Sequence, residues 1–248
     1  MFKRIVFIAL MLLISTDGLA LNLEKLTGAA GDALTAATLS NQQVAELGKQ
    51  SADELDKQNQ IAPTSNAYVT RLNRIMGKLT SVDGLKLNYK VYITKDVNAF
   101  ALPDGSIRVY TGLMDLMEDN EIFFVLGHEI GHVKNGDSSD KYRLAYSASA
   151  ARKTISAMGG KAAALSDSQL GELGETVVNA QFSQKQESDA DLYGFKLMEK
   201  NKRDTKFAVS ALLKLAALGG ESSFAEKLLS SHPDSKARAA RLETLRKK

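Results

Sequence analysis

The sequence predicts an α+β fold that is mainly helical, with one small antiparallel sheet near the middle of the chain. Three observations predict it. From residue 119 onward, apolar residues recur at helical spacing. Residues 87–93, LNYKVYI, instead alternate apolar and polar side chains, which is typical of a half-buried strand. Residues 103–106, PDGS, have the composition of a tight turn, and a short extended stretch lies on either side of it.

The composition is that of a folded globular protein. Of the 248 residues, 44% are hydrophobic and 25% are charged, which is enough apolar material for a sizeable core. The net charge of +3 is too small to indicate nucleic-acid binding, and we expect no nucleic-acid partner. The sequence contains no cysteine. This excludes a disulfide framework, a thiol nucleophile and a cysteine zinc site, and we expect no lipid anchor on an N-terminal cysteine.

Residues 1–20 have the pattern of a signal peptide. Lys3 and Arg4 precede an unbroken apolar run from Ile5 to Ile14, and small residues stand at positions 18 and 20. The run is shorter than the ~20 residues that span a bilayer, although an uncleaved anchor is the alternative. We therefore expect a signal peptide at 1–20, a leader or linker at 21–40 and one domain at 41–248. The expected location is a bacterial periplasm.

Helix and strand signals follow one another along this domain. Capping boxes of the form S-x-x-Q begin at Ser40 and Ser166 and start helices that reach about residues 60 and 182. The same reasoning places further helices at about 65–79, 119–135, 140–158, 186–200 and 205–218, and one from Pro233 to the end. Strands are expected at 87–93, 98–102 and 106–110.

Residues 128–132, HEIGH, have the spacing of a metal site. His128 and His132 are four residues apart, so in a helix both imidazoles lie on one face and can bind one ion. Glu129 is rotated by roughly 100° from His128, which suits a general base acting on water better than a third ligand. The alternative is that these are two ordinary helical histidines that bind no metal. This is less expected by chance, because the chain has only three histidines in all and two of them are here. Gly127 and Gly131 would each cost about 1 kcal/mol in a helix, which close packing of another element would explain.

Two histidines do not complete a catalytic zinc site, which usually has three protein ligands and a water. Asn135 and Ser138 occupy the positions where the longer metzincin pattern needs glycine and histidine, so that arrangement is excluded. The third ligand is then His232 or a carboxylate. Glu187 and Asp191 share one face of a later helix, where one can bind the metal while the other orients a histidine.

Four segments, in this order, resemble the gluzincin metallopeptidases of the HtpX and CaaX-prenyl-protease type. The resemblance is closer to their small soluble periplasmic branch, which includes LoiP-like and BepA-like proteins. It covers roughly residues 40–245 and implies a zincin-like fold with the small sheet beside the HExxH helix, and one Zn²⁺ per chain. The segments are NAFALPDGSIRVYTGLM (98–114), NEIFFVLGHEIGHV (120–133), FSQKQESDADLYG (182–194) and SSHPDSKAR (230–238).

The resemblance also implies roles for single residues. Glu187 matches the third zinc ligand, and Asp191 matches the acidic residue that supports a ligating histidine. His232 matches a histidine near the cleft that stabilises the oxyanion, with a capping or packing role as the alternative. Arg238 is expected to pair with a carboxylate. Asn98, Ala99 and Phe100 match the edge strand of the active-site sheet in this family, to which a peptide substrate is expected to add as a further strand.

The expected function is therefore that of a zinc endopeptidase of the bacterial envelope. The resemblance implies unfolded, misfolded or misassembled envelope proteins as substrates, and an envelope protein as a candidate partner. Two alternatives remain open. The chain could be a periplasmic chaperone or adaptor with a structural zinc, or a latent protease whose cleft is covered by residues 21–40 or 136–165. The absence of a membrane-spanning segment of the HtpX kind makes the processing of prenylated peptides unexpected.

Overall fold

The computed structural model describes residues 39–77, 79–152, 165–218 and 225–247. The predicted signal peptide, most of the predicted leader and part of the candidate lid at 136–165 lie outside these residues. The strands are β1 (Ser81–Val82), β2 (Leu85–Lys86), β3 (Asn88–Tyr92), β4 (Ala99–Ala101) and β5 (Ser106–Tyr110). The helices are α2 (Asn41–Gln58), α3 (Ala67–Met76), α4 (Thr111–Leu116), α5 (Asp119–Asn135), α6 (Asp137–Arg152), α7 (Asp167–Asn179), α8 (Gln184–Lys200), α9 (Lys206–Leu218), α10 (Glu226–Ser231) and α11 (Ser235–Arg246).

The mainly helical α+β class is confirmed, but the main sheet is mixed rather than antiparallel. Its strand order is β3-β5-β4, in which β5 pairs antiparallel with β4 and parallel with β3. The predicted turn at 103–106 connects β4 to β5 and is closed by the Gly105 amide, which donates to the Leu102 carbonyl at 2.9 Å. Alternating side chains indicate which face of a strand is buried, but they do not specify the direction of its partner. The β1–β2 hairpin was not expected, because each of its strands has only two residues.

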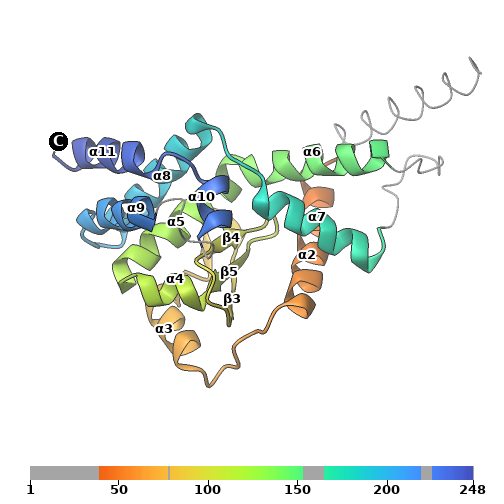
Figure 1. Ribbon diagram of the computed structural model, residues 1–248, viewed down its shortest axis with the longest axis horizontal. Coiled ribbons are helices and arrows are strands. Elements are labelled where there is room, and N and C mark those ends of the chain that lie inside the picture. The colour runs from red at the N-terminus through yellow and green to blue at the C-terminus, as the bar shows by residue number, and fades with distance from the viewer. Residues whose placement is uncertain (1–38, 78, 153–164, 219–224, 248) are drawn as a thin grey trace, which may run out of the picture.

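Helices cover both faces of this sheet (Figure 1). Val91, Ala99, Ile107 and Val109 point from one face into the larger hydrophobic core, to which α5 contributes its apolar residues. Tyr92, Phe100 and Leu102 point from the other face into a second core formed with α2, α6 and α7. Helix α5 packs along α8 and also contacts α9, so it lies at the centre of the larger core. Both cores are therefore organised around one small sheet, and β4 contributes to each of them.

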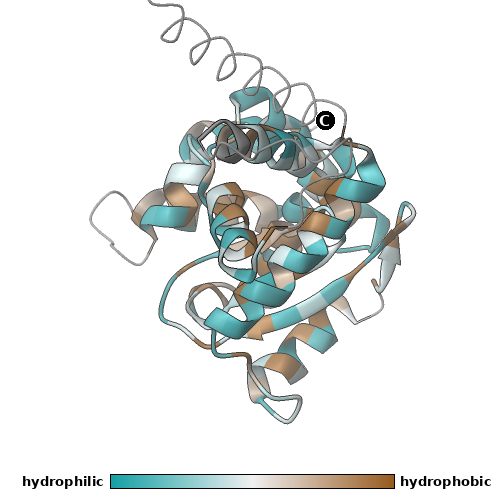
Figure 2. Cartoon of the chain, turned by 90° about the vertical axis from the view of Figure 1, so that its right-hand side faces the viewer, coloured by the Kyte–Doolittle hydropathy of each residue, from teal (hydrophilic) through white to brown (hydrophobic). Residues whose placement is uncertain are grey.

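Hydrophobic and hydrophilic residues alternate along single helices, as expected for helices with one buried face (Figure 2). The capping boxes at Ser40 and Ser166 are confirmed, and a third one, from Ser183 to Gln186, starts α8 two residues earlier than expected. Helices α4 and α10 were not predicted, because six residues are too few to show a helical period. Within the described ranges, no helix combines the length and the apolar composition needed to cross a bilayer.

A buried ion pair joins α2 to the sheet. Nε and Nη2 of Arg108 donate to the two carboxylate oxygens of Asp56 at 2.7 and 2.9 Å, and Arg108 is only 1% exposed. Tyr92 and Lys90 donate to the same carboxylate, each at 2.6 Å. Burial opposes ionisation of Asp56, but the hydrogen bonds from Arg108, Lys90 and Tyr92 outweigh it and lower its pKa. Asp56 is therefore charged at neutral pH and compensates the buried guanidinium.

We expect Asp56→Ala to lower the free energy of unfolding by about 3–5 kcal/mol, because it leaves the buried charge of Arg108 without a carboxylate partner. The matched control is Asp53→Ala on the same helix, where the carboxylate is 57% exposed and, within the described ranges, pairs with Lys49 alone at the surface. That change should stay within about 0.5 kcal/mol of the wild type. Urea denaturation measures both. Equal stability of the two variants would contradict a structural role for the buried pair.

Candidate metal centre

Four buried side chains from three parts of the chain meet beside α5. His128 and His132 come from α5, Glu187 comes from the first turn of α8, and His232 directly follows α10. Each offers one nitrogen or oxygen atom, and these atoms all lie within 4.8 Å of one another. The sequence left the third ligand open between His232 and a carboxylate, and the fold places both in the same cluster.

The donor atoms are arranged as they would be around a small ion. The two Nε2 atoms of His128 and His132 are 3.1 Å apart, and Oε1 of Glu187 lies 3.3 Å from Nε2 of His132. Nδ1 of His232 lies 3.3 Å from Nε2 of His128 and 3.0 Å from Oε1 of Glu187. Ligands at 2.0–2.1 Å in a tetrahedral zinc site lie about 3.3 Å from one another. Three imidazoles and one carboxylate therefore fit a zinc ion.

A carboxylate orients each of the two α5 histidines. Nδ1 of His128 lies 3.0 Å from Oδ1 of Asp191, and Nδ1 of His132 lies 2.9 Å from Oδ2 of Asp137. In each pair the ring donates its Nδ1–H to the carboxylate, which leaves Nε2 free to face the cluster. The sequence predicted this position for Asp191 but did not identify Asp137. The sequence feature that could have identified Asp137 is the preceding Gly136. Its left-handed backbone (φ 86°) ends α5 and brings the next residue back toward His132.

Asp191 is held in turn by arginines of α11. Nε and Nη2 of Arg238 donate to its two oxygens at 2.9 and 2.7 Å, and Nη2 of Arg241 donates at 2.8 Å. Burial opposes ionisation of Asp191, but hydrogen bonds from His128 and Arg238 outweigh it and lower its pKa to about 2. Nη1 of Arg238 also contacts Oε2 of Glu187. Arg238 thus pairs with carboxylates, as the resemblance implied.

Glu129 lies beside the cluster but outside the set of candidate ligands. Its side chain is buried, and Oε1 is 3.6 Å from Nε2 of His232. Burial raises the pKa of Glu129, and the nearby imidazoles of His128 and His132 only partly oppose this. Burial also lowers the pKa of His232 to about 4, so that this ring is neutral at pH 7 and able to bind a metal. A carboxyl group with a raised pKa suits the uptake and return of a proton.

The loop between α7 and α8 closes over the centre. The Phe182 ring stacks on the His132 ring with centroids 3.6 Å apart and an angle of 6° between the planes. Its backbone amide donates to the Ser231 carbonyl at 3.0 Å. Lys141 of α6 lies over the other side of the Phe182 ring and donates to the Ala180 carbonyl. The sequence did not identify either residue, because neither a lone phenylalanine in a loop nor a single lysine within a helix forms a recognisable pattern.

The predicted substrate strand is an edge strand that is covered in this conformation. Within the main sheet, β4 pairs with β5 on one side only. Asn98, Ala99 and Phe100 are nevertheless buried, with Ala99 only 1% exposed. The Ser138 hydroxyl of α6 donates to the Ala101 carbonyl at 3.5 Å. A peptide can therefore reach this edge only after neighbouring segments have moved.

Glycines allow α5 and α8 to approach closely, as the sequence suggested. A Cβ atom at Gly131 would lie 3.0 Å from Cα of Ala190, and one at Gly127 would lie 3.2 Å from Cα of Gly194. A Cβ atom at Gly194 would lie 2.9 Å from the backbone nitrogen of His128. The ligands of the two helices meet because the two backbones are this close.

We expect Gly194→Ala to push α8 away from α5, because the atoms it meets are backbone atoms that cannot yield. Overpacking of this kind costs about 1–3 kcal/mol of stability. Glu187 would also leave His128 and His132, so zinc affinity should fall by about 10–100-fold. The control is Gly171→Ala in α7, where the new methyl group meets only the flexible amide end of Gln58. Thermal unfolding and zinc titration measure both, and unchanged zinc affinity in Gly194→Ala would contradict the packing argument.

The comparisons with known proteins agree with this geometry. Residues 63–246 match the model of peptidase family M48. Metalloprotease YcaL of Escherichia coli is 42% identical over 226 residues, which are 91% of this chain and 87% of that protein. Metalloprotease LoiP of E. coli is 41% identical over 215 residues, covering 86% of this chain and 84% of that protein. Mitochondrial metalloendopeptidase OMA1 of Schizosaccharomyces pombe is 26% identical over 193 residues, or 75% and 55% of the two chains. The chain belongs to peptidase family M48 and is a metalloprotease.

Proposed function

We propose that this metalloprotease is a zinc-dependent endopeptidase that cleaves unfolded or misassembled proteins of the bacterial envelope. The observation that carries the proposal is the buried cluster of His128, His132, Glu187 and His232 with Glu129 beside it. A substrate that adds to β4 as a strand must be extended, which favours unfolded chains over folded ones. We expect hydrolysis of casein and no hydrolysis of a stably folded domain. Equal rates on both would contradict the preference for unfolded chains.

Each residue of the site has a separate role in the proposed hydrolysis. His128, His132 and Glu187 would hold zinc, which when bound supplies a Lewis acid that lowers the pKa of water toward about 7. Glu129 takes the proton from the attacking water and later passes it to the leaving amine. Asp191 and Asp137 keep the two imidazoles in the tautomer that leaves Nε2 free.

We further propose that the conformation described here is a latent form of the protease. A catalytic zinc keeps its fourth position open for water, whereas His232 stands at the fourth position of this cluster. Phe182 covers His132, and β4 is buried. Four protein ligands are also typical of a structural zinc, as a chaperone or adaptor would have. A structural site has no use for the buried carboxylate of Glu129, so latency is the better explanation.

We expect His232→Ala to hydrolyse casein severalfold faster than the wild type, because it frees the fourth position while three ligands remain. The competing role is the stabilisation of the oxyanion, and loss of such a donor lowers kcat by about 10²–10³-fold. The two roles thus predict opposite signs in one assay. Zinc content is measured on the same samples to confirm that the metal is retained. A lower rate at full zinc content would reject latency and support the oxyanion role.

We propose a periplasmic location from the sequence of residues 1–20, with a mature chain that begins near Leu21. Fractionation of cells that express the full chain, followed by N-terminal sequencing, tests this directly. The expected result is recovery from the periplasmic fraction with the first twenty residues removed. Recovery from the cytoplasm with an intact N-terminus would contradict the proposed location and leave the chemistry of the site unaffected.

A further inference from the structure

We propose that a pocket beside β4 binds a basic side chain, arginine or lysine, of the peptide substrate and so determines part of the specificity. The inference rests on the proposed function, in which a peptide adds to the edge of β4. The pocket has a volume of about 90 Å³, several times the roughly 10–15 Å³ that a cavity needs in order to hold one water molecule. It therefore has room for the end of one long side chain.

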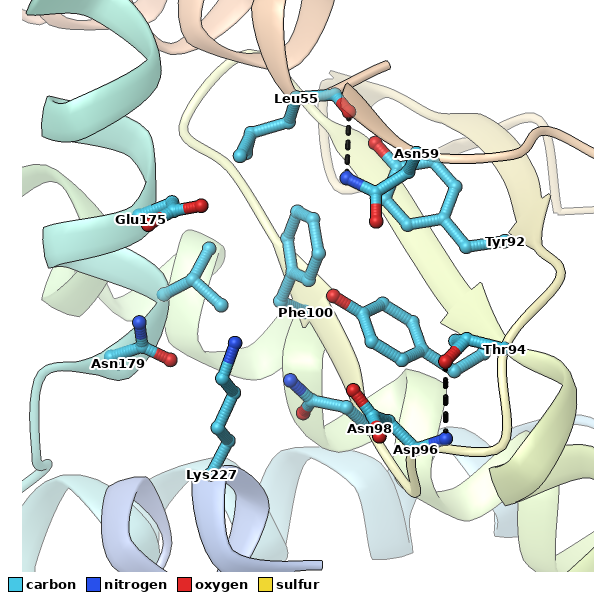
Figure 3. Close-up of a pocket in the computed structure, with 12 residues that line it drawn as sticks. Leu55, Asn59, Tyr92, Thr94, Asp96, Asn98, Phe100, Glu175, Asn179 and Lys227 are labelled. Carbon is cyan, nitrogen blue, oxygen red and sulfur yellow. Dashed lines mark hydrogen bonds between the residues drawn. The ribbon is translucent and has the colours of Figure 1, made fainter. Parts of the chain in front are cut away.

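The pocket lies on the face of the sheet opposite the core that contains α5. Its floor is formed by three rings, one from each strand, with centroids 5.6–6.3 Å apart: Tyr92 of β3, Tyr110 of β5 and Phe100 of β4. Glu175 and Asn179 of α7 lie across from Phe100, and Lys227 extends from α10 toward the same space (Figure 3). The pocket is therefore bounded by the edge strand on one side and by α7 and α10 on the other.

Strand geometry directs alternate substrate side chains to this pocket. Ala99 and Ala101 belong to the core that contains α5, whereas Asn98 and Phe100 line the pocket. Successive side chains of a strand point to opposite faces of a sheet. A peptide paired with β4 would thus direct one side chain toward the α5 face and the next toward the pocket. The pocket should select the residue at one position and not its immediate neighbours.

The charges around the floor favour a cation. Burial and the neighbouring carboxylates of Asp96 and Glu175 raise the pKa of Tyr110 to about 12, which indicates a negative potential at its hydroxyl group. Among the residues that the structure describes, neither carboxylate forms an ion pair. Aromatic ring faces and unpaired carboxylates both attract an ammonium or guanidinium group. Lys227 has no ion-pair partner in the described ranges either, so its ammonium group opposes a basic side chain and reduces the selectivity.

The test uses the full-length enzyme and a peptide with one cleavage site, in which each residue around the bond is replaced in turn by Arg, Ala or Glu. The measured quantity is the ratio of kcat/KM for the Arg peptide to that for the Ala peptide. We expect the ratio to exceed one at a single position of the peptide. The positions two residues before and after it are the only others at which the ratio could also exceed one. Glu175→Gln and Asp96→Asn should each lower this ratio by about two- to fivefold, and Lys227→Gln should raise it by a similar factor.

Glu226→Gln is the matched control, because Glu226 precedes Lys227 on α10 but does not line the pocket. Its ratio should equal that of the wild type. A preference for Glu peptides, or ratios that do not respond to Glu175→Gln and Lys227→Gln while casein is still hydrolysed, would overturn the pocket assignment and leave the proposed function intact. Absence of hydrolysis of both casein and all peptides would overturn the proposed function, and the pocket assignment with it.

Discussion

Glu129→Gln is expected to retain zinc and to lose peptide hydrolysis by about 10²–10⁴-fold. The amide has nearly the same shape as the carboxylate but cannot take the proton from water. Glu129 lies outside the cluster of candidate ligands, so the metal should stay bound. Burial raises the pKa of Glu129, which means that the site holds it as a group able to bind and release a proton. The measurement is casein hydrolysis and zinc content on the same preparations.

The control for this change is Glu199→Gln, at an exposed carboxylate near the end of α8. It should match the wild type in rate and in zinc content. Activity of Glu129→Gln within a factor of about three of the wild type would remove Glu129 from the chemistry. Loss of zinc in this variant would instead show that Glu129 is a ligand, contrary to its place beside the cluster.

Glu187→Gln is expected to weaken zinc binding by more than about 100-fold. Mutation of a residue that only orients a metal ligand already lowers metal affinity by about 10–100-fold, and loss of a ligand should cost more. Burial opposes ionisation of Glu187, but the imidazoles of His128 and His232 outweigh it and hold its pKa well below the usual range. The carboxylate is therefore anionic where a cation would bind. The amide would lack this charge and would also remove the ion pair between Glu187 and Nη1 of Arg238, whose other nitrogens still contact Asp191.

Zinc titration against a chelator of known affinity measures this change, and circular dichroism confirms that the variant is folded. The control on the same helix is Asp189→Asn, whose half-exposed carboxylate pairs, among the described residues, with Lys185 alone. It should bind zinc as the wild type does. Wild-type affinity in a folded Glu187→Gln variant would show that the three histidines suffice and that Glu187 is not a ligand.

Local sequence patterns were sufficient to predict the core of the candidate site. His128 and His132 share a helical face whatever the tertiary structure, so their spacing alone placed them together. The glycines at 127 and 131 predicted a close neighbour, which is α8. Glu187 and Asp191 depended on a different kind of argument. Spacing made them candidates, and only the resemblance to a known family selected a role for each.

The features that the sequence did not predict all depend on contacts between distant segments. The strand pattern gave the buried face of β3 but not its parallel pairing with β5. Asp137 reaches His132 through the left-handed turn at Gly136, and Phe182 stacks on His132 through a loop with no periodicity. The sequence left His232 as one candidate for the third ligand, and the resemblance placed it near the cleft. Its place at the fourth position of the cluster follows from how α10 packs, which no local pattern encodes.

The central claim is that the cluster around His128 is a metal centre on which hydrolysis depends. The most direct measurement adds zinc stepwise to metal-free wild-type protein and follows casein hydrolysis and bound zinc together. We predict no hydrolysis without metal and a rate that rises in proportion to bound zinc until one ion is bound per chain. Hydrolysis by the metal-free protein, or a rate that does not follow the bound metal, would contradict the claim.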